Sequence, residues 1–128
     1  MPQTNYLISV IDDDPSMSRM LCRAINAAGL SVDAFGSAEA FLESEASVAS
    51  VCLILDMNLP GMSGLELQQL LNVLRPEVPI IFMSAQADEA TQLRALEAGA
   101  VGFLRKPFSI DSLLATLRSI PLPYAGRL

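Results

Sequence analysis

Five short segments with the composition of β-strands alternate along this chain with segments of helical periodicity, and this alternation is its most constraining feature. When a helix follows each strand, it brings the chain back to the end of the sheet at which that strand began. The strands then run parallel, and the helices cover both faces of the sheet. The sequence therefore predicts a doubly wound α/β domain. The expected strands are residues 6–11, 31–35, 51–56, 79–83 and 102–104.

The expected helices differ in how clearly their apolar faces repeat. Residues 17–28, 67–74 and 110–120 carry apolar side chains at helical spacing. Two weaker patterns, at residues 38–47 and 88–98, complete a set of five helices. Residues 51–55 are almost continuously apolar, which is typical of a central parallel strand covered on both faces. Short right-handed connections then favour the strand order 2-1-3-4-5, in which strands 1 and 3 are neighbours.

The chain length of 128 residues corresponds to one domain, which we assign to residues 1–120. Pro121, Pro123 and Gly126 break a helix, so residues 121–128 are expected to be a tail or the start of a linker. No apolar run approaches the ~20 residues of a membrane span. No basic segment followed by an apolar stretch resembles a secretory signal. The expected location is therefore the cytoplasm, without membrane contact.

Charge and the missing residue types exclude several functions. A net charge of −6 and a pI of about 4.4 argue against nucleic-acid binding by this domain, because phosphate contacts need a basic face. The chain has no histidine, which removes Ser-His-Asp catalysis and histidine-ligated zinc. Cys22 and Cys52 lack Cys-x-x-Cys spacing and lie among apolar neighbours, so we expect buried free thiols in a reducing compartment. Among these classes of function, chemistry based on carboxylate side chains therefore remains.

Acidic residues follow two strands that the predicted order makes neighbours. Asp12 and Asp13 come after the first strand, and Asp56 ends the third. Adjacent strands lie about 5 Å apart, so these carboxylates are expected to cluster. Asp14 has a different role, because Asp before Pro15 is typical of a helix N-cap. Each residue alone also fits a solvated turn, but a cluster of this kind needs a further explanation.

Three close carboxylates repel one another unless a cation or a raised pKa relieves them. Lys106 follows the fifth strand, roughly 10 Å from the third, and a lysine side chain covers most of that distance. Its charge and one divalent cation would balance the three carboxylates. Mg²⁺ suits such a site because it takes few carboxylates and pairs with phosphate oxygens. Ser84, after the fourth strand, places a hydroxyl at the same edge.

Five stretches of the sequence resemble the receiver domains of two-component response regulators, which have a flavodoxin-like fold. The stretches occur in the expected order, and the resemblance covers about residues 5–120. They are residues 10–16, 53–64, 83–85, 98–100 and 103–108.

The resemblance implies a role for each polar residue at the strand ends. Asp56 corresponds to the phosphoacceptor, and Asp13 to the direct Mg²⁺ ligand. Asp12 would hold the metal through water, and Asn58 would offer its backbone carbonyl, which leaves the Asn58 side chain freer to vary. Ser84 corresponds to the hydroxyl that contacts the phosphoryl oxygens.

The resemblance also assigns residues of the last strand and the loop after it. Lys106 would pair with the phosphoryl group and with Asp56, and the bond between Lys106 and Pro107 would be cis. Phe103 corresponds to the aromatic switch residue, here without a hydroxyl. The phosphoryl donor would be a phosphohistidine on a sensor histidine kinase, because this chain has no histidine. The domain would not be an enzyme beyond self-catalysed phosphotransfer and slow autodephosphorylation.

Several readings of the output stay open. Residues 12–16, 35–39 and 62–67 resemble the corresponding parts of receivers that precede DNA-binding domains. The chain is therefore expected to be the receiver part of a transcription regulator with a helix-turn-helix output. A stand-alone receiver and a phosphate-independent interaction module are alternatives. A small aspartyl-phosphate phosphohydrolase is another, because Asp56-x-Asn58 faintly resembles the nucleophile loop of such enzymes, although Asn58 cannot act as a general acid. A flavin site fits the fold, but the acidic first loop would repel a flavin phosphate.

The expected signalling surface comprises the fourth helix, the fifth strand and the fifth helix. Its charged side chains have both signs, so a symmetric homodimer through this face is an alternative to simple solvation. These residues are Arg94, Glu97, Arg105, Asp111 and Arg118.

Overall fold

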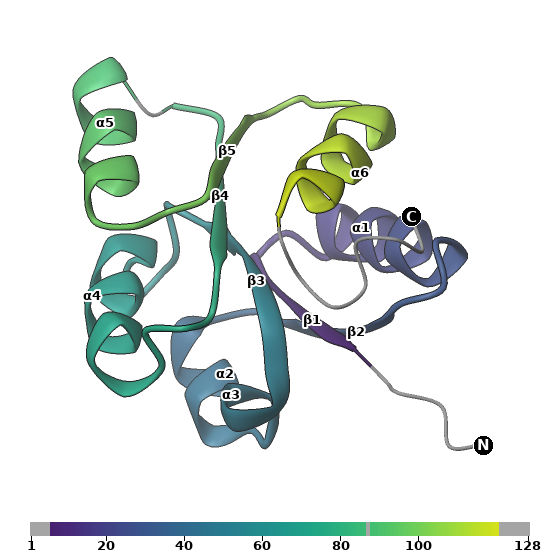
Figure 1. Cartoon of the computed structure of the whole chain (residues 1–128), viewed down its shortest axis with the longest axis horizontal. Coiled ribbons are helices and arrows are strands. Elements are labelled where there is room, and N and C mark those ends of the chain that lie inside the picture. Colours follow the sequence, from purple (N-terminus) through teal and green to yellow (C-terminus); the bar gives the residue numbers. More distant parts are fainter. Residues whose placement is uncertain (1–5, 87, 121–128) are drawn as a thin grey trace.

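The computed structural model describes residues 6–86 and 88–120, and it contains one five-stranded parallel sheet (Figure 1). The strand order β2-β1-β3-β4-β5 is the predicted one. The predicted strands are confirmed with shifts of one residue at some ends. Their bounds are β1 Leu7–Ile11, β2 Ser31–Phe35, β3 Ser50–Asp56, β4 Ile80–Ser84 and β5 Gly102–Arg105. The expected tail at residues 121–128 lies outside the described residues.

Six helices, rather than the predicted five, accompany these strands in the described part of the chain. The expected helix at residues 38–47 is interrupted at Ser44, whose backbone is extended at φ −93° and ψ 156°. The Ser44 hydroxyl accepts a hydrogen bond from the Ala46 N–H at 2.9 Å, so Ser44 ends one helix and helps to start the next. The helices are α1 Pro15–Ala27, α2 Ala38–Glu43, α3 Ala46–Ala49, α4 Gly64–Leu74, α5 Glu89–Glu97 and α6 Ile110–Ser119.

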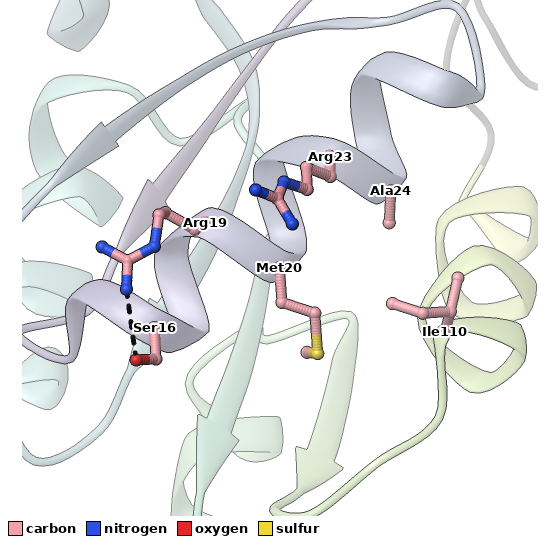
Figure 2. Close-up of a pocket in the computed structure, with 6 residues that line it drawn as sticks. All are labelled: Ser16, Arg19, Met20, Arg23, Ala24 and Ile110. Atoms are coloured by element: carbon pink, nitrogen blue, oxygen red, sulfur yellow. Dashed lines mark hydrogen bonds between the residues drawn. The ribbon is translucent and has the colours of Figure 1, made fainter.

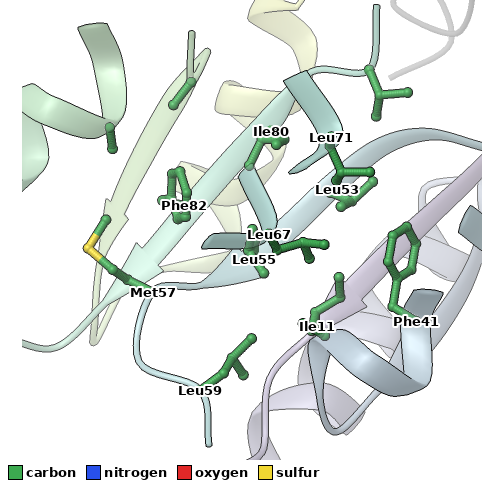
Figure 3. Packing of buried hydrophobic residues seen from close by; sticks show 14 of the residues in the cluster. Ile11, Phe41, Leu53, Leu55, Met57, Leu59, Leu67, Leu71, Ile80 and Phe82 are labelled. Carbon is green, nitrogen blue, oxygen red and sulfur yellow. The ribbon is translucent and has the colours of Figure 1, made fainter. Parts of the chain in front are cut away.

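The helices cover both faces of the sheet (Figure 1). A layer of buried apolar side chains lies on each face, between the sheet and its helices. Successive side chains of β3 point to opposite faces, so Leu53 and Leu55 pack with α2–α5, while Cys52 and Ile54 pack with α1 and α6. Figure 3 shows the first of these layers around Leu53 and Leu55. The continuous apolar run of β3 therefore fills both layers, and each of its large side chains contributes about 1.5–3 kcal/mol by burial.

The two cysteines are both free, but they differ in burial. Cys52 is fully buried, as predicted, whereas Cys22 is half-buried, so that part of the prediction was wrong. Leu21 and Ile25 are the buried residues of α1, and Cys22 lies beside this stripe rather than on it. Partial burial, followed by the nearby charge of Asp33, raises the pKa of the Cys22 thiol.

None of the helices among residues 6–86 and 88–120 combines the length and the apolar character that crossing a membrane requires.

Helix α4 begins in close contact with the end of β3. The Gly64 N–H donates to the Met57 carbonyl at 3.2 Å. A Cβ at Gly64 would lie 2.6 Å from the Asp56 carbonyl oxygen and 2.9 Å from Met57 Cα, distances at which the backbone must move. Glycine at this position therefore lets α4 start directly against the residue that carries the central carboxylate.

We expect Gly64→Ala to lower the free energy of unfolding by about 1–3 kcal/mol, because the added methyl group overpacks a backbone contact. Gly36→Ala is the matched control, since a Cβ there has no neighbour within 4 Å. Chemical denaturation of both variants checks this expectation. Equal stability of the two variants would show that the contact at Gly64 relaxes without loss.

Candidate functional site

Three carboxylates meet where the carboxyl ends of β1 and β3 lie side by side. The pairing of Ile11 with Leu55 makes the following residues, Asp12 and Asp56, neighbours across the two strands. Asp12, Asp13 and Asp56 each place a carboxylate oxygen within 4.8 Å of the others. Asp12 and Asp56 are buried, and Asp13 is exposed. The structure thus brings together the three residues that the sequence predicted to cluster.

Lys106, which follows the outer strand β5, contacts both buried carboxylates. Its Nζ lies 2.8 Å from Asp12 Oδ2 and 3.1 Å from Asp56 Oδ2. The Lys106 N–H donates to the Ser84 carbonyl at 2.9 Å, which anchors the lysine backbone to the end of β4. The Lys106–Pro107 peptide bond is cis, the isomer that the resemblance implies. The lysine therefore spans the distance from β5 to β3 that its length was expected to cover.

Backbone amides fix the other oxygens of the same two carboxylates. Asp12 Oδ1 accepts from the Asp14 N–H at 2.9 Å, and Asp56 Oδ1 accepts from the Asn58 N–H at 3.0 Å. Each buried carboxylate therefore has one oxygen on the backbone and one on Lys106. Asp14 itself accepts from the Ser16 N–H at 2.9 Å and caps α1, as predicted. This arrangement holds Asp12 and Asp56 in fixed orientations toward the exposed Asp13.

Ser84 and Asn58 form a contact that the sequence reasoning missed. The Asn58 Nδ2 donates to the Ser84 Oγ at 3.2 Å, and the Gln86 N–H donates to the same oxygen at 3.2 Å. The resemblance assigns only the Asn58 backbone carbonyl to the site and leaves its side chain free to vary. In the structure that side chain links the loop after β3 to the end of β4. Ser84 is buried, so its hydroxyl lies within the protein rather than on a solvated cap.

Phe103 lies on β5, opposite Phe82 of β4 in the strand pairing. The two ring centroids are 6.5 Å apart with an interplanar angle of 35°. Phe103 is half-buried, and it packs against the apolar layer that contains Phe82. The predicted switch residue therefore lies between the core and the surface, in the strand next to Ser84.

Burial and like charge oppose ionisation at the centre of the cluster. The pKa of Asp56 is raised, first by burial and then by the charge of Asp12, and these effects outweigh the Asn58 N–H and Lys106. Burial alone would lower the pKa of Lys106, but its hydrogen bonds and charge interactions with Asp12 and Asp56 raise it. Three carboxylates and one ammonium leave a formal charge of −2. A hard divalent cation with oxygen ligands, such as Mg²⁺, fits this donor set.

A shallow groove lies beside this site between α1 and α6 (Figure 2). Helix α1 starts directly after the acidic loop, and Arg19 and Arg23 follow one another along one side of it. Arg19 donates to the Ser16 Oγ at 3.4 Å. Met20 and Ile110 supply apolar lining. The groove therefore combines two cations and apolar side chains on an otherwise acidic protein.

Comparison with known proteins identifies the family. The sequence matches the response regulator receiver domain over residues 8–118. The response regulator protein TmoT of Ectopseudomonas mendocina is 40% identical over 119 residues, which are 93% of this chain and 54% of TmoT. The transcriptional regulatory protein FixJ of Bradyrhizobium diazoefficiens is 36% identical over 112 residues, or 88% of this chain and 55% of FixJ. The solved structure of the response regulator StyR has a TM-score of 0.81 at 39% identity, covering 91% of this chain and 59% of StyR.

The family match defines the general class of the domain, because receiver domains of response regulators are signalling domains rather than catalysts. The chain belongs to the response regulator receiver domain family, and its relatives include transcription regulators. It spans about half the length of the curated relatives that it matches. The resemblance seen in the sequence is thereby confirmed.

Mg²⁺ is expected to raise the melting temperature, because a ligand that binds only the folded state stabilises it. Asp13→Ala should weaken Mg²⁺ binding at least ~10-fold, or about 1.4 kcal/mol, since it removes an accessible carboxylate of the cluster. Asp14→Ala is the matched control, because Asp14 caps α1 and lies outside the cluster. Thermal unfolding across a Mg²⁺ titration gives both values. A larger loss of affinity in Asp14→Ala would show that the ligand was assigned to the wrong residue.

Without Mg²⁺, Asp56→Asn should increase the free energy of unfolding by on the order of 1 kcal/mol at neutral pH. The folded state raises the pKa of Asp56, so it holds this proton more tightly than the unfolded chain does. Stability therefore falls as pH rises from the ordinary value of 3.8 through the raised pKa, and the variant lacks this loss. Urea unfolding at a series of pH values, with exposed Asp33→Asn as control, measures it. A stability gain that shrinks with rising pH would contradict the assignment.

Proposed function

We propose that this domain is a phosphorylation-dependent switch in which Asp56 accepts a phosphoryl group in the presence of Mg²⁺. The observation that carries this proposal is the position of Lys106, whose Nζ contacts both Asp12 and Asp56. A positive charge fixed beside a carboxylate nucleophile can stabilise the equatorial oxygens of an incoming phosphoryl group. Such transfer depends on positioning and charge neutralisation more than on covalent help from the protein.

Each residue of the site has a part in this proposal. A carboxylate oxygen of Asp56 attacks phosphorus, the bond to the donor breaks, and an acyl phosphate forms. Asp12, Asp13, Asp56 and the backbone carbonyl of Asn58 would hold Mg²⁺, which supplies neutralising charge. Lys106 retains its contact with Asp12 while it pairs with the new phosphoryl oxygens.

The proposed donor is a phosphohistidine on a sensor histidine kinase. The sequence has no histidine, so a phosphohistidine donor must come from outside this domain. The groove of Arg19, Met20, Arg23 and Ile110 begins beside the acidic loop, and it offers charge and apolar surface to a docked donor. Buried, reduced Cys52 is consistent with the cytoplasm as the place of this transfer.

The proposed output passes from Ser84 to the surface of α5, β5 and α6. A phosphoryl group adds roughly 1.5–2 negative charges and new acceptor oxygens, toward which the Ser84 hydroxyl moves. That motion breaks the link to Asn58, and it opens space that the Phe103 ring can fill, because voids in packed protein are unfavourable. Leu93 and Leu96 are exposed on this surface, which supports its use in a symmetric homodimer.

The proposed context is a transcription response regulator with a DNA-binding output domain. The length of the relatives supports this context, because their matched segments cover about half of each protein. The domain itself, with its net charge of −6, is proposed to bind neither nucleic acid nor membrane. A stand-alone receiver, an interaction module and a small phosphohydrolase are the alternatives, and turnover of a phosphate ester would identify the last of them.

Incubation with acetyl phosphate and Mg²⁺ should add one phosphoryl group to the wild-type domain. Asp56→Asn should remove this labelling, because an amide is not a competent nucleophile here. Asp33→Asn, with its exposed position on β2, is the matched control and should label like wild type. Intact-mass spectrometry measures all three proteins. Equal labelling of Asp56→Asn would refute the acceptor assignment, and a larger hydrodynamic radius on labelling would support the dimer.

A further inference from the structure

Two polar side chains of α4 bind the last turn of α5. Gln68 Nε2 donates to the Ala95 carbonyl at 3.0 Å, and Asn72 Nδ2 donates to the Ala98 carbonyl at 2.9 Å. Gln68 and Asn72 are one turn apart and therefore lie on the same side of α4. The two helices lie next to each other on one face of the sheet (Figure 1). The end of α5 is thus attached to α4 by two hydrogen bonds, in addition to its connection along the chain.

Full burial along α5 occurs only at this end. Within α5, all of which the structure describes, Ala95 is the only buried residue. Its carbonyl also accepts from the Ala100 N–H at 3.0 Å, so this turn is bonded to both α4 and the chain that leads into β5. Residues 89–93 are exposed or half-buried. The C-terminal turn of α5 is therefore held at Ala95, whereas in the N-terminal half Thr91 and Gln92 are only half-buried. The side-chain contact of that half is one exposed hydrogen bond, which Arg105 of β5 donates to Gln92 Oε1 at 3.1 Å.

Burying the Gln68 side chain costs free energy that a purely structural contact would not require. It is 1% exposed, and its Oε1 has no hydrogen-bond partner among residues 6–86 and 88–120. Burying a polar atom without a partner is unfavourable, and methionine would fill a similar volume without that penalty. What methionine cannot do is donate a hydrogen bond to Ala95. The Gln68 amide therefore helps to fix the position of α5 relative to α4 by a contact that methionine could not make.

Both ends of α5 connect to the acidic site by different routes. Its N-terminal end follows Ser84 after a short segment of chain. Its C-terminal end is bound to α4, which starts at Gly64 against the Asp56 backbone and is held by the buried Leu67 and Leu71. Movement at Ser84 therefore reaches the N-terminal end of α5 first, where the exposed Arg105–Gln92 hydrogen bond must give way, while α4 keeps the other end in place.

We infer that Gln68 and Asn72 are positioning residues that make the last turn of α5 a pivot, about which the N-terminal half of the helix turns when the site is loaded. The inference rests on the proposed function and extends it to the regulation of the same site. The pivot converts a small displacement at Ser84 into a rotation of the exposed surface around Gln92 and Leu93. Without it, the same displacement would shift the whole helix.

Amide hydrogen exchange tests the pivot without any phosphoryl mimic. In wild type, the amides of residues 98–100 should exchange several-fold more slowly than those of residues 91–93. The combined variant Gln68→Met/Asn72→Ala should lose this difference while the amides of α4 keep their protection. Gln69→Met is the matched control, because Gln69 is exposed on α4 next to Gln68 and should leave exchange unchanged. Unchanged protection of residues 98–100 in the combined variant would overturn the pivot.

Amide chemical shifts with Mg²⁺ and beryllofluoride, a phosphoryl mimic, test the motion. Wild type should show large changes at residues 89–93 and small ones at residues 95–98, whereas the combined variant should show changes along all of α5. Gln68→Met should keep or raise the melting temperature. If the melting temperature falls and the mimic causes the same shift changes as in wild type, Gln68 has only a structural role and the inference is overturned. Uniform shifts along wild-type α5 would overturn it too. No response at Asp13 or Asn58 in wild type would overturn the proposed function instead, whereas the exchange result stands by itself.

Discussion

The rest of the structure depends on holding two buried carboxylates, Asp12 and Asp56, at adjacent strand ends. Their charges repel, and burial makes the repulsion stronger because little solvent screens it. Lys106 and two backbone amides offset part of this repulsion, which is why the residues after β1, β3 and β5 must all meet at one edge. The two apolar layers around β1 and β3 supply the stability against which this local strain is tolerated.

Incomplete neutralisation of the carboxylates is consistent with the proposed use of this site for both a cation and an anion. With a formal charge of −2, the cluster attracts a divalent cation and repels a phosphoryl group. With a divalent cation bound, the formal charge would be zero, and in the proposed reaction a phosphoryl group could then approach Asp56. The Asn58–Ser84 contact lies directly beside this change of charge, so the first structural consequence is expected at the end of β4 rather than in the core.

The sequence predicted the parts of the structure that follow from local pattern. Apolar runs located the strands, and the residues after them located Asp12, Asp13 and Asp56, because a parallel sheet places these ends at one edge. The interruption at Ser44 was missed because its cause is one side chain bonding to the Ala46 backbone. The Asn58–Ser84 contact was missed because it joins residues 26 positions apart through the conformation of a loop.

The burial of Gln68 was not predicted for a different reason. The sequence alone places this glutamine among the polar residues of α4, which are expected to face solvent. Its burial depends on where α5 lies, and α5 is the helix with the weakest apolar pattern. The longer helices of the described chain each bury at least two side chains, whereas α5 buries only Ala95. Apart from the buried Ala95, α5 is attached mainly through hydrogen bonds, from Gln68 and Asn72 of α4 and from Arg105 of β5. A helix with so little buried side chain has low local stability, and elements of low stability are the ones that move in a switch. The scarcity of buried side chains on α5 therefore supports its proposed role in carrying a signal from Ser84 to the surface.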